Sequence, residues 1–173
     1  LEAHIEAVKQ GKLNSNSANA SQNRQAKIIA RYDENKLPDK GLFFAPSIIE
    51  LDSMEQLNDE VFGPVLHIIR YKAKQLDKVL KEVNNSGYGL TLGIHTRIES
   101  MAEHIYANTA VGNTYINRNT IGAVVGTQPF GGEGLSGTGP KAGGPHYLYR
   151  FATEKTKTIN TVATGGNTDL FGL

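Results

Sequence analysis

Cysteine is absent from the 173 residues of this sequence. That absence excludes a thiolate zinc site, a disulfide framework and a cysteine nucleophile within the chain itself. Long hydrophobic runs are absent too, since no apolar stretch approaches the roughly 20 residues that span a bilayer. The opening residues also lack the pattern of a signal peptide. We therefore expect no membrane span and a cytoplasmic location.

Neither sign of charge is in excess, because the sequence contains 18 lysines and arginines and 17 aspartates and glutamates, for a net charge of +1. Such a balance provides no electrostatic footprint for nucleic acid or for an anionic membrane. The histidines do not cluster with the spacing of metal ligands; they are His4, His67, His95, His104 and His146. We expect neither a nucleic-acid partner nor a bound metal ion.

The length of 173 residues fits one domain of common size. The sequence begins without methionine, and its first apolar residues, Leu1, Ile5 and Val8, already follow helical spacing. A helix that starts without a capping residue, and a C-terminus that stops as abruptly, lead us to expect a fragment of a longer protein.

From residue 65 onward, segments typical of strands alternate with segments typical of helices. Residues 65–72 predict a buried strand, and residues 90–96 and 111–117 predict two more. Two helices are indicated between them by apolar residues on one face: Leu76, Val79, Leu80 and Val83 in the first, and Ile98, Met101, Ala102 and Ile105 in the second. This alternation predicts an α/β fold with a mostly parallel sheet flanked by helices.

The remaining segments complete the predicted domain. Residues 13–24 form a polar loop that we expect to be mobile, and a short strand is expected over residues 26–33. The apolar run 41–51 contains Pro46, which favours an edge strand or a bulge. A weak alternation near the C-terminus predicts an exposed strand that seeks a partner. We therefore divide the chain into a main domain, 1–153, and a strand with a C-terminal tail, 154–173.

The run PFGGEGLSGTGPKAGGP, residues 129–145, holds seven of the 19 glycines. Gly132, Gly134 and Gly137 spell G-x-G-x-x-G, but a dinucleotide fingerprint needs a strand directly before it and a helix at its last glycine. The following prolines and paired glycines exclude that helix, and Lys141 is not followed by the Ser or Thr of a P-loop. The prolines and aromatic residues also disfavour a flexible linker. A rigid loop whose backbone N–H groups bind an anion, and a tight structural loop without a ligand, both remain.

The stretch NDEVFGPV, residues 58–65, places an acidic pair before an aromatic-Gly-Pro turn. The pair can simply close one element and start a strand. Alternatively, one carboxylate can accept hydrogen bonds from paired hydroxyls such as those of a ribose. The residues alone leave both interpretations open.

Four stretches follow one another with the order and spacing found in aldehyde dehydrogenases: DEVFGPV (59–65), NNSGYGLTLGIHTR (84–97), GNTYINRN (112–119) and QPFGGEGLSGTG (128–139). Together they resemble the C-terminal part of that family, over almost all of residues 41–167. The extension KAGGPHYL resembles the branch that oxidises L-glutamate γ-semialdehyde, the hydrolysed form of 1-pyrroline-5-carboxylate. The tail INTVATGGN is similar to that branch in the bifunctional proline utilization enzymes.

The resemblance implies NAD as cofactor and a role for five residues. Glu60 corresponds to the carboxylate that grips the nicotinamide ribose hydroxyls, and Phe62 to the aromatic residue beside the nicotinamide. Gly143 and Gly144 correspond to the loop whose backbone N–H groups anchor the α-carboxylate of the substrate. Phe151 corresponds to the aromatic residue that packs on the aliphatic chain of the substrate.

The resemblance also implies what this chain does not supply. In the family a cysteine thiolate attacks the aldehyde, hydride passes to NAD⁺, and water hydrolyses the thioester. The nucleophile, its glutamate base, the oxyanion-hole asparagine and the nucleotide-binding domain lie upstream of this sequence. We therefore expect the chain to be inactive alone, and to need the missing N-terminal part of its parent as a partner.

Residues 155–161 resemble an oligomerisation flap that pairs with another subunit, which implies a homo-oligomer. In a bifunctional parent, FAD belongs to a separate proline dehydrogenase domain. Two alternatives stay open. One is an aldehyde dehydrogenase for a different substrate, and the other is a non-catalytic domain of the same fold that serves assembly.

Overall fold

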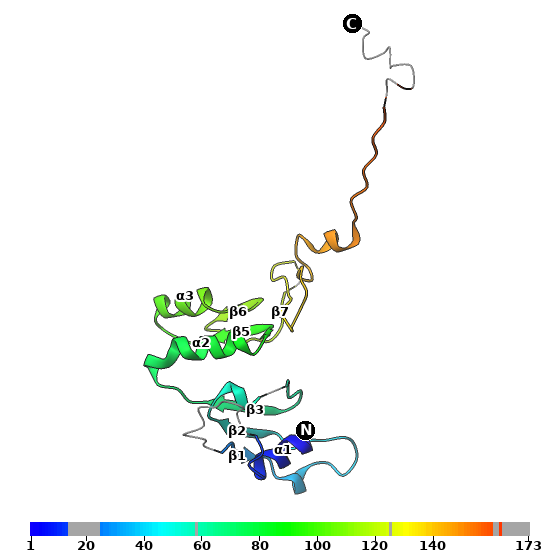
Figure 1. Cartoon of the computed structure of the whole chain (residues 1–173). Coiled ribbons are helices and arrows are strands. Elements are labelled where there is room, and N and C mark those ends of the chain that lie inside the picture. Colours follow the sequence, from blue (N-terminus) through cyan, green and yellow to red (C-terminus); the bar gives the residue numbers. More distant parts are fainter. Residues whose placement is uncertain (14–24, 58, 125, 161–162, 164–173) are drawn as a thin grey trace.

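The computed structural model describes residues 1–13, 25–57, 59–124, 126–160 and 163. Figure 1 shows two bodies joined by a short connection: a helix packed on a three-stranded sheet, and a pair of helices beside shorter strands. The glycine-rich run leaves the second body and leads through a short helix into an extended segment. The loop expected over residues 13–24 lies, except for Leu13, outside the described residues.

The first body is built on α1 (Glu2–Lys9), which confirms the helix expected at the start of the chain. Its buried face consists of Ile5 and Val8, 0% and 3% exposed. They pack with Ile49 and Leu51 of the sheet, and with Ala26 just before the first strand. Removing this apolar surface from water, at roughly 25 cal/mol per Å², is what holds the helix on the sheet.

The sheet of the first body has the order β1 (Lys27–Arg31), β2 (Ser47–Leu51), β3 (Val65–Ile69). The prediction of an edge strand or bulge for residues 41–51 is wrong, because β2 is the central strand, antiparallel to β1 and parallel to β3. Pro46 stands just before the strand, where its missing N–H costs no ladder bond, and its carbonyl accepts from Tyr32 N–H at 2.8 Å.

The prediction of a buried strand over residues 65–72 is wrong in its burial. β3 ends at Ile69 and pairs only with β2 among the described strands, so it forms the edge of this sheet. Leu66 is 56% exposed on it. The apolar composition of β3 is typical of a strand that is buried on both faces. In this structure each of its residues is half-buried or exposed.

The second body contains α2 (Leu76–Asn85), β4 (Tyr88–Gly89), β5 (Thr91–Ile94), α3 (Glu99–Ala107) and β6 (Asn113–Ile116). Both helices and both longer strands occur where the sequence predicts them. β5 and β6 are parallel, with α3 as the crossover between them. Buried side chains from all four hold this body together, namely Leu80, Ile94, Ala102 and Tyr115.

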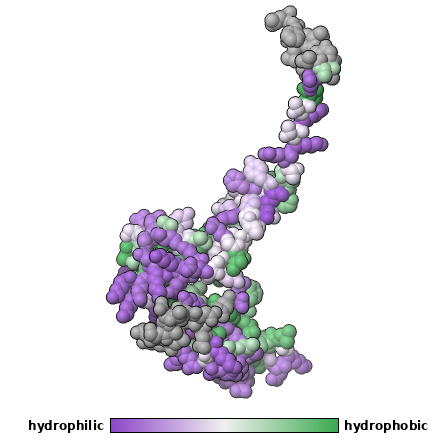
Figure 2. Space-filling view, viewed as in Figure 1, coloured by the Kyte–Doolittle hydropathy of each residue, from purple (hydrophilic) through white to green (hydrophobic). Residues whose placement is uncertain are grey.

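The α/β class is confirmed, but the described strands form three sheets rather than one. Besides the three-stranded sheet and β5–β6, β4 pairs antiparallel with β7 (Glu133–Gly134) from the glycine-rich run. Short 3-10 helices are η1 (Glu34–Lys36), η2 (Met54–Gln56), η3 (Ala73–Gln75) and η4 (Tyr147–Phe151). Figure 2 shows a largely hydrophilic surface over α2 and α3, and more apolar surface on the first body.

The strand expected in the C-terminal segment does not form within residues 152–160, which are exposed and carry no strand in the described structure. Figure 1 shows this segment extended and directed away from both bodies. Residues 161, 162 and 164–173 lie outside the described residues, and the oligomerisation flap stays a prediction.

Candidate functional site

A cavity of about 380 Å³ lies between the two bodies and contains Glu60 in its wall. The first body contributes η2, the acidic segment after it and His67 of β3, and the second contributes the end of α2 and strands β4 and β5. Ser136 of the glycine-rich run closes one side. The cavity therefore joins the acidic segment to the near end of the glycine-rich run.

Two neighbouring carboxylates, Asp59 and Glu60, line this cavity. Both residues are exposed, and neither forms a hydrogen bond or an ion pair with any residue that the structure describes. A carboxylate in this state keeps its acceptor sites available for hydroxyl groups of a ligand. Apolar neighbours such as Leu57, Val61 and Leu90 give the rest of the wall a surface suited to a ring or a sugar face.

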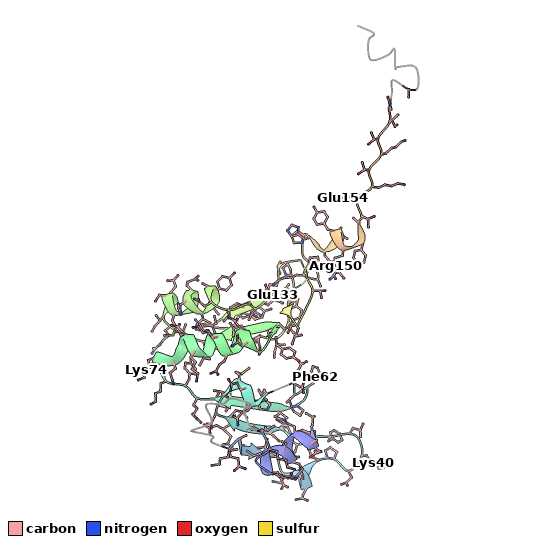
Figure 3. All side chains as sticks on the ribbon, viewed as in Figure 1. Lys40, Phe62, Lys74, Glu133, Arg150 and Glu154 are labelled. Atoms are coloured by element: carbon pink, nitrogen blue, oxygen red, sulfur yellow. The ribbon has the colours of Figure 1, made fainter. Side chains whose placement is uncertain are left out.

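Phe62 lies outside this cavity. Its side chain is 85% exposed, and Figure 3 shows it at the edge of the first body, pointing away from the sheet. The structure therefore places Glu60 in the cavity wall and leaves the aromatic ring, two residues on, uncovered by the described residues.

The glycine-rich run, residues 129–145, folds into a series of turns that we call the tongue. No helix begins at Gly137 in the described structure. Near its start, β7 pairs with β4, and Ser136 Oγ accepts the Gly89 N–H at 3.0 Å. Gly132 must be a glycine, because a Cβ there would come within 2.6 Å of the Ser136 carbonyl oxygen. These glycines serve close backbone approach, so the G-x-G-x-x-G spacing is not a nucleotide cradle in this fold.

The far end of the tongue is a four-residue turn, 141–144. The Gly144 N–H donates to the Lys141 carbonyl oxygen at 3.0 Å, and Gly143, the third residue, has φ +71°. A positive φ at that position is the signature of a type II turn and favours glycine. Because Gly144 uses its N–H to close the turn, the Gly143 N–H is the one of the pair without a partner among the described residues.

Phe151 ends η4 and is 75% exposed. Its ring meets Tyr147 edge-on, with centroids 5.6 Å apart. Gly143, Gly144 and Phe151 therefore lie in one C-terminal stretch of the chain, whereas Glu60 and Phe62 belong to the first body. Ser136, in the cavity wall, is the part of the tongue that lies near the acidic segment.

Sequence reasoning missed two polar residues at the base of the tongue, Asn113 and Lys141. Asn113 is 9% exposed at the start of β6, and Lys141 begins the turn. Asn113 bonds the backbone of Pro129 and Gly131 in the run, and Lys141 bonds the Gly112 carbonyl oxygen and Asn113 Oδ1 at the start of β6. Their signal in the sequence was the pair Gly112-Asn113 at the start of a predicted strand and the lysine before Ala-Gly-Gly, but neither pattern is distinctive by itself.

A histidine pair links α1 to β3 beside the cavity. The Nε2 atoms of His4 and His67 lie 3.0 Å apart, so one ring donates and the other accepts. Burial lowers the pKa of both histidines below the ordinary value of 6.5; the nearby N-terminal charge lowers that of His4 further, and His4 lowers that of His67 further. The folded chain therefore favours both rings in their neutral form.

We expect the chain to lose stability as the pH falls below about 6.5. The lowered pKa values mean that the unfolded chain binds protons first, so the free energy of unfolding is retained above that pH and declines below it. The check is the urea midpoint from about pH 7.5 to about pH 5.5. His67→Gln should flatten this dependence, while exchange of the exposed His95 for glutamine should leave it as it is. An equally steep decline in the His67 variant would contradict the assignment.

The described part of the chain contains no group of three or more His, Cys, Asp or Glu side chains arranged to hold a metal ion. Its helices are also too short or too polar to cross a membrane.

Comparisons with known proteins identify the family and the fold of this chain. The Aldehyde dehydrogenase family matches residues 3–157. The bifunctional protein PutA of Klebsiella aerogenes is 60% identical over 115 residues, which cover 66% of this chain and 9% of that protein. A crystal structure of a Bradyrhizobium japonicum Proline Utilization A variant superimposes with a TM-score of 0.77 at 52% identity, covering 95% of this chain and 15% of the other.

A smaller relative shows the same fold. The 1-pyrroline-5-carboxylate dehydrogenase from Thermus, solved with bound NAD, superimposes with a TM-score of 0.68 at 33% identity, covering 86% of this chain and 26% of that enzyme. This chain thus spans about a tenth of the bifunctional relative and about a quarter of the smaller enzyme.

Proposed function

The chain belongs to the aldehyde dehydrogenase family, and we propose that it forms the substrate-anchoring part of an NAD-dependent dehydrogenase that oxidises L-glutamate γ-semialdehyde to L-glutamate. The observation that carries the proposal is the 141–144 turn, which presents the unpartnered Gly143 N–H on a rigid tongue. Support for the substrate comes from relatives named as PutA and as 1-pyrroline-5-carboxylate dehydrogenase.

The turn suits a carboxylate that lies far from the reacting aldehyde. The Gly143 N–H can approach an anion closely, because a glycine turn places no side chain between this donor and the ligand. Gly143 is exposed, and a Cβ built on it would meet only one atom within 4 Å, at 3.9 Å. Phe151 supplies an exposed ring for the aliphatic part of the substrate. A simple alkyl aldehyde has no group to use this anchor.

The cavity at Glu60 suits part of a dinucleotide. Two hydroxyls of a ribose can donate to one carboxylate, and the unpaired state of Glu60 in the described structure leaves both of its oxygens available. Phe62, two residues on, is the aromatic surface we assign to the nicotinamide side. NAD, when bound, supplies the hydride acceptor of the reaction. The contribution of this chain is to orient the ribose.

Catalysis also needs a nucleophile, which these 173 residues cannot supply because they contain no cysteine. We propose that it comes from a polypeptide segment outside this sequence, and that the chain is inactive alone. The exposed segment 154–160 is the surface we assign to pairing with a second copy. In a bifunctional parent, FAD would serve a separate domain for proline oxidation.

The test is NADH formation by the full-length protein that carries this sequence. L-glutamate γ-semialdehyde should be oxidised with a kcat/KM roughly a hundredfold above that of propanal, because only the former can use the anchor. The 173-residue chain assayed alone should give no turnover and only very weak NAD⁺ binding. Equal kcat/KM for both aldehydes would reject the substrate, and inactivity of the full-length protein would favour an assembly role.

A further inference from the structure

We propose that Asn113 and Lys141 are positioning residues for the substrate, which hold the 141–144 turn against the start of β6. The inference rests on the proposed function, since it assigns to these residues the placement of the Gly143 N–H. Neither side chain needs to touch the substrate. Both act through the backbone of the tongue.

Asn113 forms hydrogen bonds with the backbone of the tongue on both sides of Phe130. Its Nδ2 donates to the Pro129 carbonyl oxygen at 3.0 Å, and its Oδ1 accepts the Gly131 N–H at 3.2 Å. The side chain is buried at the first position of β6. A buried amide that satisfies two backbone groups fixes the position of the segment to which they belong.

The fixed segment is bonded directly to the anchor turn. Phe130 and Ala142 exchange two backbone hydrogen bonds, 3.0 Å and 2.9 Å long, as an isolated antiparallel bridge. Ala142 is the second residue of the turn and immediately precedes Gly143. Any shift of residues 129–131 is therefore passed to the Gly143 N–H without an intervening flexible residue.

Lys141 ties the first residue of the turn to the same point on β6. Its ammonium group donates to the Gly112 carbonyl oxygen and, at 3.3 Å, to Asn113 Oδ1. The lysine is only partly exposed, and donation by a charged group makes these bonds stronger than those between neutral partners. The turn is thus held at Lys141 by a side chain and at Ala142 by the backbone bridge.

Two glycines allow this close packing. A Cβ on Gly112 would lie 1.9 Å from the Gly131 carbonyl oxygen, and a Cβ on Gly131 would lie 3.3 Å from Lys141 Cα. The backbone segments at Gly112, Gly131 and Lys141 therefore lie against one another with no side chain between them. Beyond this junction residues 145–151 are exposed, and a backbone hydrogen bond of 3.2 Å from the Tyr147 N–H to the Gly144 carbonyl oxygen links the turn to the exposed η4.

This arrangement predicts that the two side chains set affinity for carboxylate-bearing aldehydes. A displaced N–H no longer meets the substrate carboxylate, whereas an aldehyde without that carboxylate is indifferent to the displacement. A residue needed only for folding would affect both substrates alike.

The experiment compares Lys141→Met, Lys141→Arg and Asn113→Ala in the full-length enzyme, with L-glutamate γ-semialdehyde and propanal as substrates. Lys141→Met keeps the aliphatic stem but removes the donors, and should raise the KM for the semialdehyde about tenfold. Its kcat, and both constants for propanal, should stay within about twofold. Asn113→Ala should show the same selective rise, and Lys141→Arg, which keeps a charged donor, should retain most of the affinity. Lys74→Met, at an exposed lysine of η3, is the matched control.

The outcomes separate this inference from the proposed function. A wild-type enzyme that prefers the semialdehyde, combined with an unchanged KM in Lys141→Met and Asn113→Ala, would overturn the positioning role and leave the proposed function intact. Equal losses for both aldehydes, or failure of both variants to fold, would show that the two residues serve stability instead. A wild-type enzyme without preference for the semialdehyde would reject the proposed function itself.

Discussion

Replacing Gly144 by proline is expected to raise the KM for L-glutamate γ-semialdehyde about a hundredfold in the full-length enzyme, the scale that a displacement of about 1 Å can cost. Proline has no N–H, so it removes the hydrogen bond that closes the 141–144 turn at the Lys141 carbonyl oxygen. Its ring would also crowd that oxygen, since even a Cβ on Gly144 would lie 3.0 Å from it. The Gly143 N–H would then be displaced from the substrate carboxylate.

Steady-state kinetics with two aldehydes would measure this effect. Propanal should keep its KM within about threefold, because it does not use the anchor. Gly144→Ala retains the N–H and should have a smaller effect than proline. Gly122→Ala provides a control for backbone strain, because Gly122 also has a positive φ, +75°, but faces open space. Similar losses for both aldehydes in Gly144→Pro would refute the anchor assignment.

Local periodicity was sufficient to predict the helices. Ile5 and Val8 in α1, and Leu80 in α2, are buried on the faces that their spacing indicates. Such amphipathic faces arise from residues three and four apart, so the information is contained within one or two turns of chain. The parallel pair β5–β6 followed from the same local alternation of strand and helix.

Strand position within the sheet could not be predicted in this way. Pro46 suggested an edge, yet it precedes the first bonded residue of β2 and leaves that strand free to occupy the centre. The apolar residues of β3 suggested burial, yet the strand lies at an edge of the described sheet. Both errors have one cause: neighbours in a sheet are set by distant segments, which a local pattern does not contain.

The candidate site shows the same division. Glu60 was identified from a resemblance, and the structure adds a cavity and a carboxylate without a partner among the described residues. The prolines and glycines of the glycine-rich run predict a rigid loop, and in the structure the run folds into turns closed by backbone hydrogen bonds. Which N–H is available, Gly143 rather than Gly144, depends on one turn hydrogen bond. The roles of Asn113 and Lys141 depend on contacts between residues 16 to 29 positions apart in sequence, which no short motif displays.

Exchange of Glu60 for glutamine should slow hydride transfer by roughly ten- to a hundredfold, the equivalent of about 1–3 kcal/mol for the loss of charge-assisted hydrogen bonds. Glutamine keeps the size of the side chain but replaces one acceptor oxygen by a donor, so it cannot accept from two hydroxyls at once. The ribose would then be held less firmly in the orientation that hydride transfer requires.

Single-turnover formation of NADH with saturating aldehyde would isolate this step from product release. Asp59→Asn is the matched control, because Asp59 precedes Glu60, lines the same cavity and is equally free of ion pairs among the described residues. It should keep the hydride-transfer rate within about twofold, whereas Glu60→Gln should not. The expected loss should be the same for the semialdehyde and for propanal, since the ribose contact does not depend on the aldehyde. Unchanged rates in Glu60→Gln would leave the acidic pair only the role of closing a turn before β3, and an equal loss in Asp59→Asn would refute the assignment of the ribose contact to Glu60 alone.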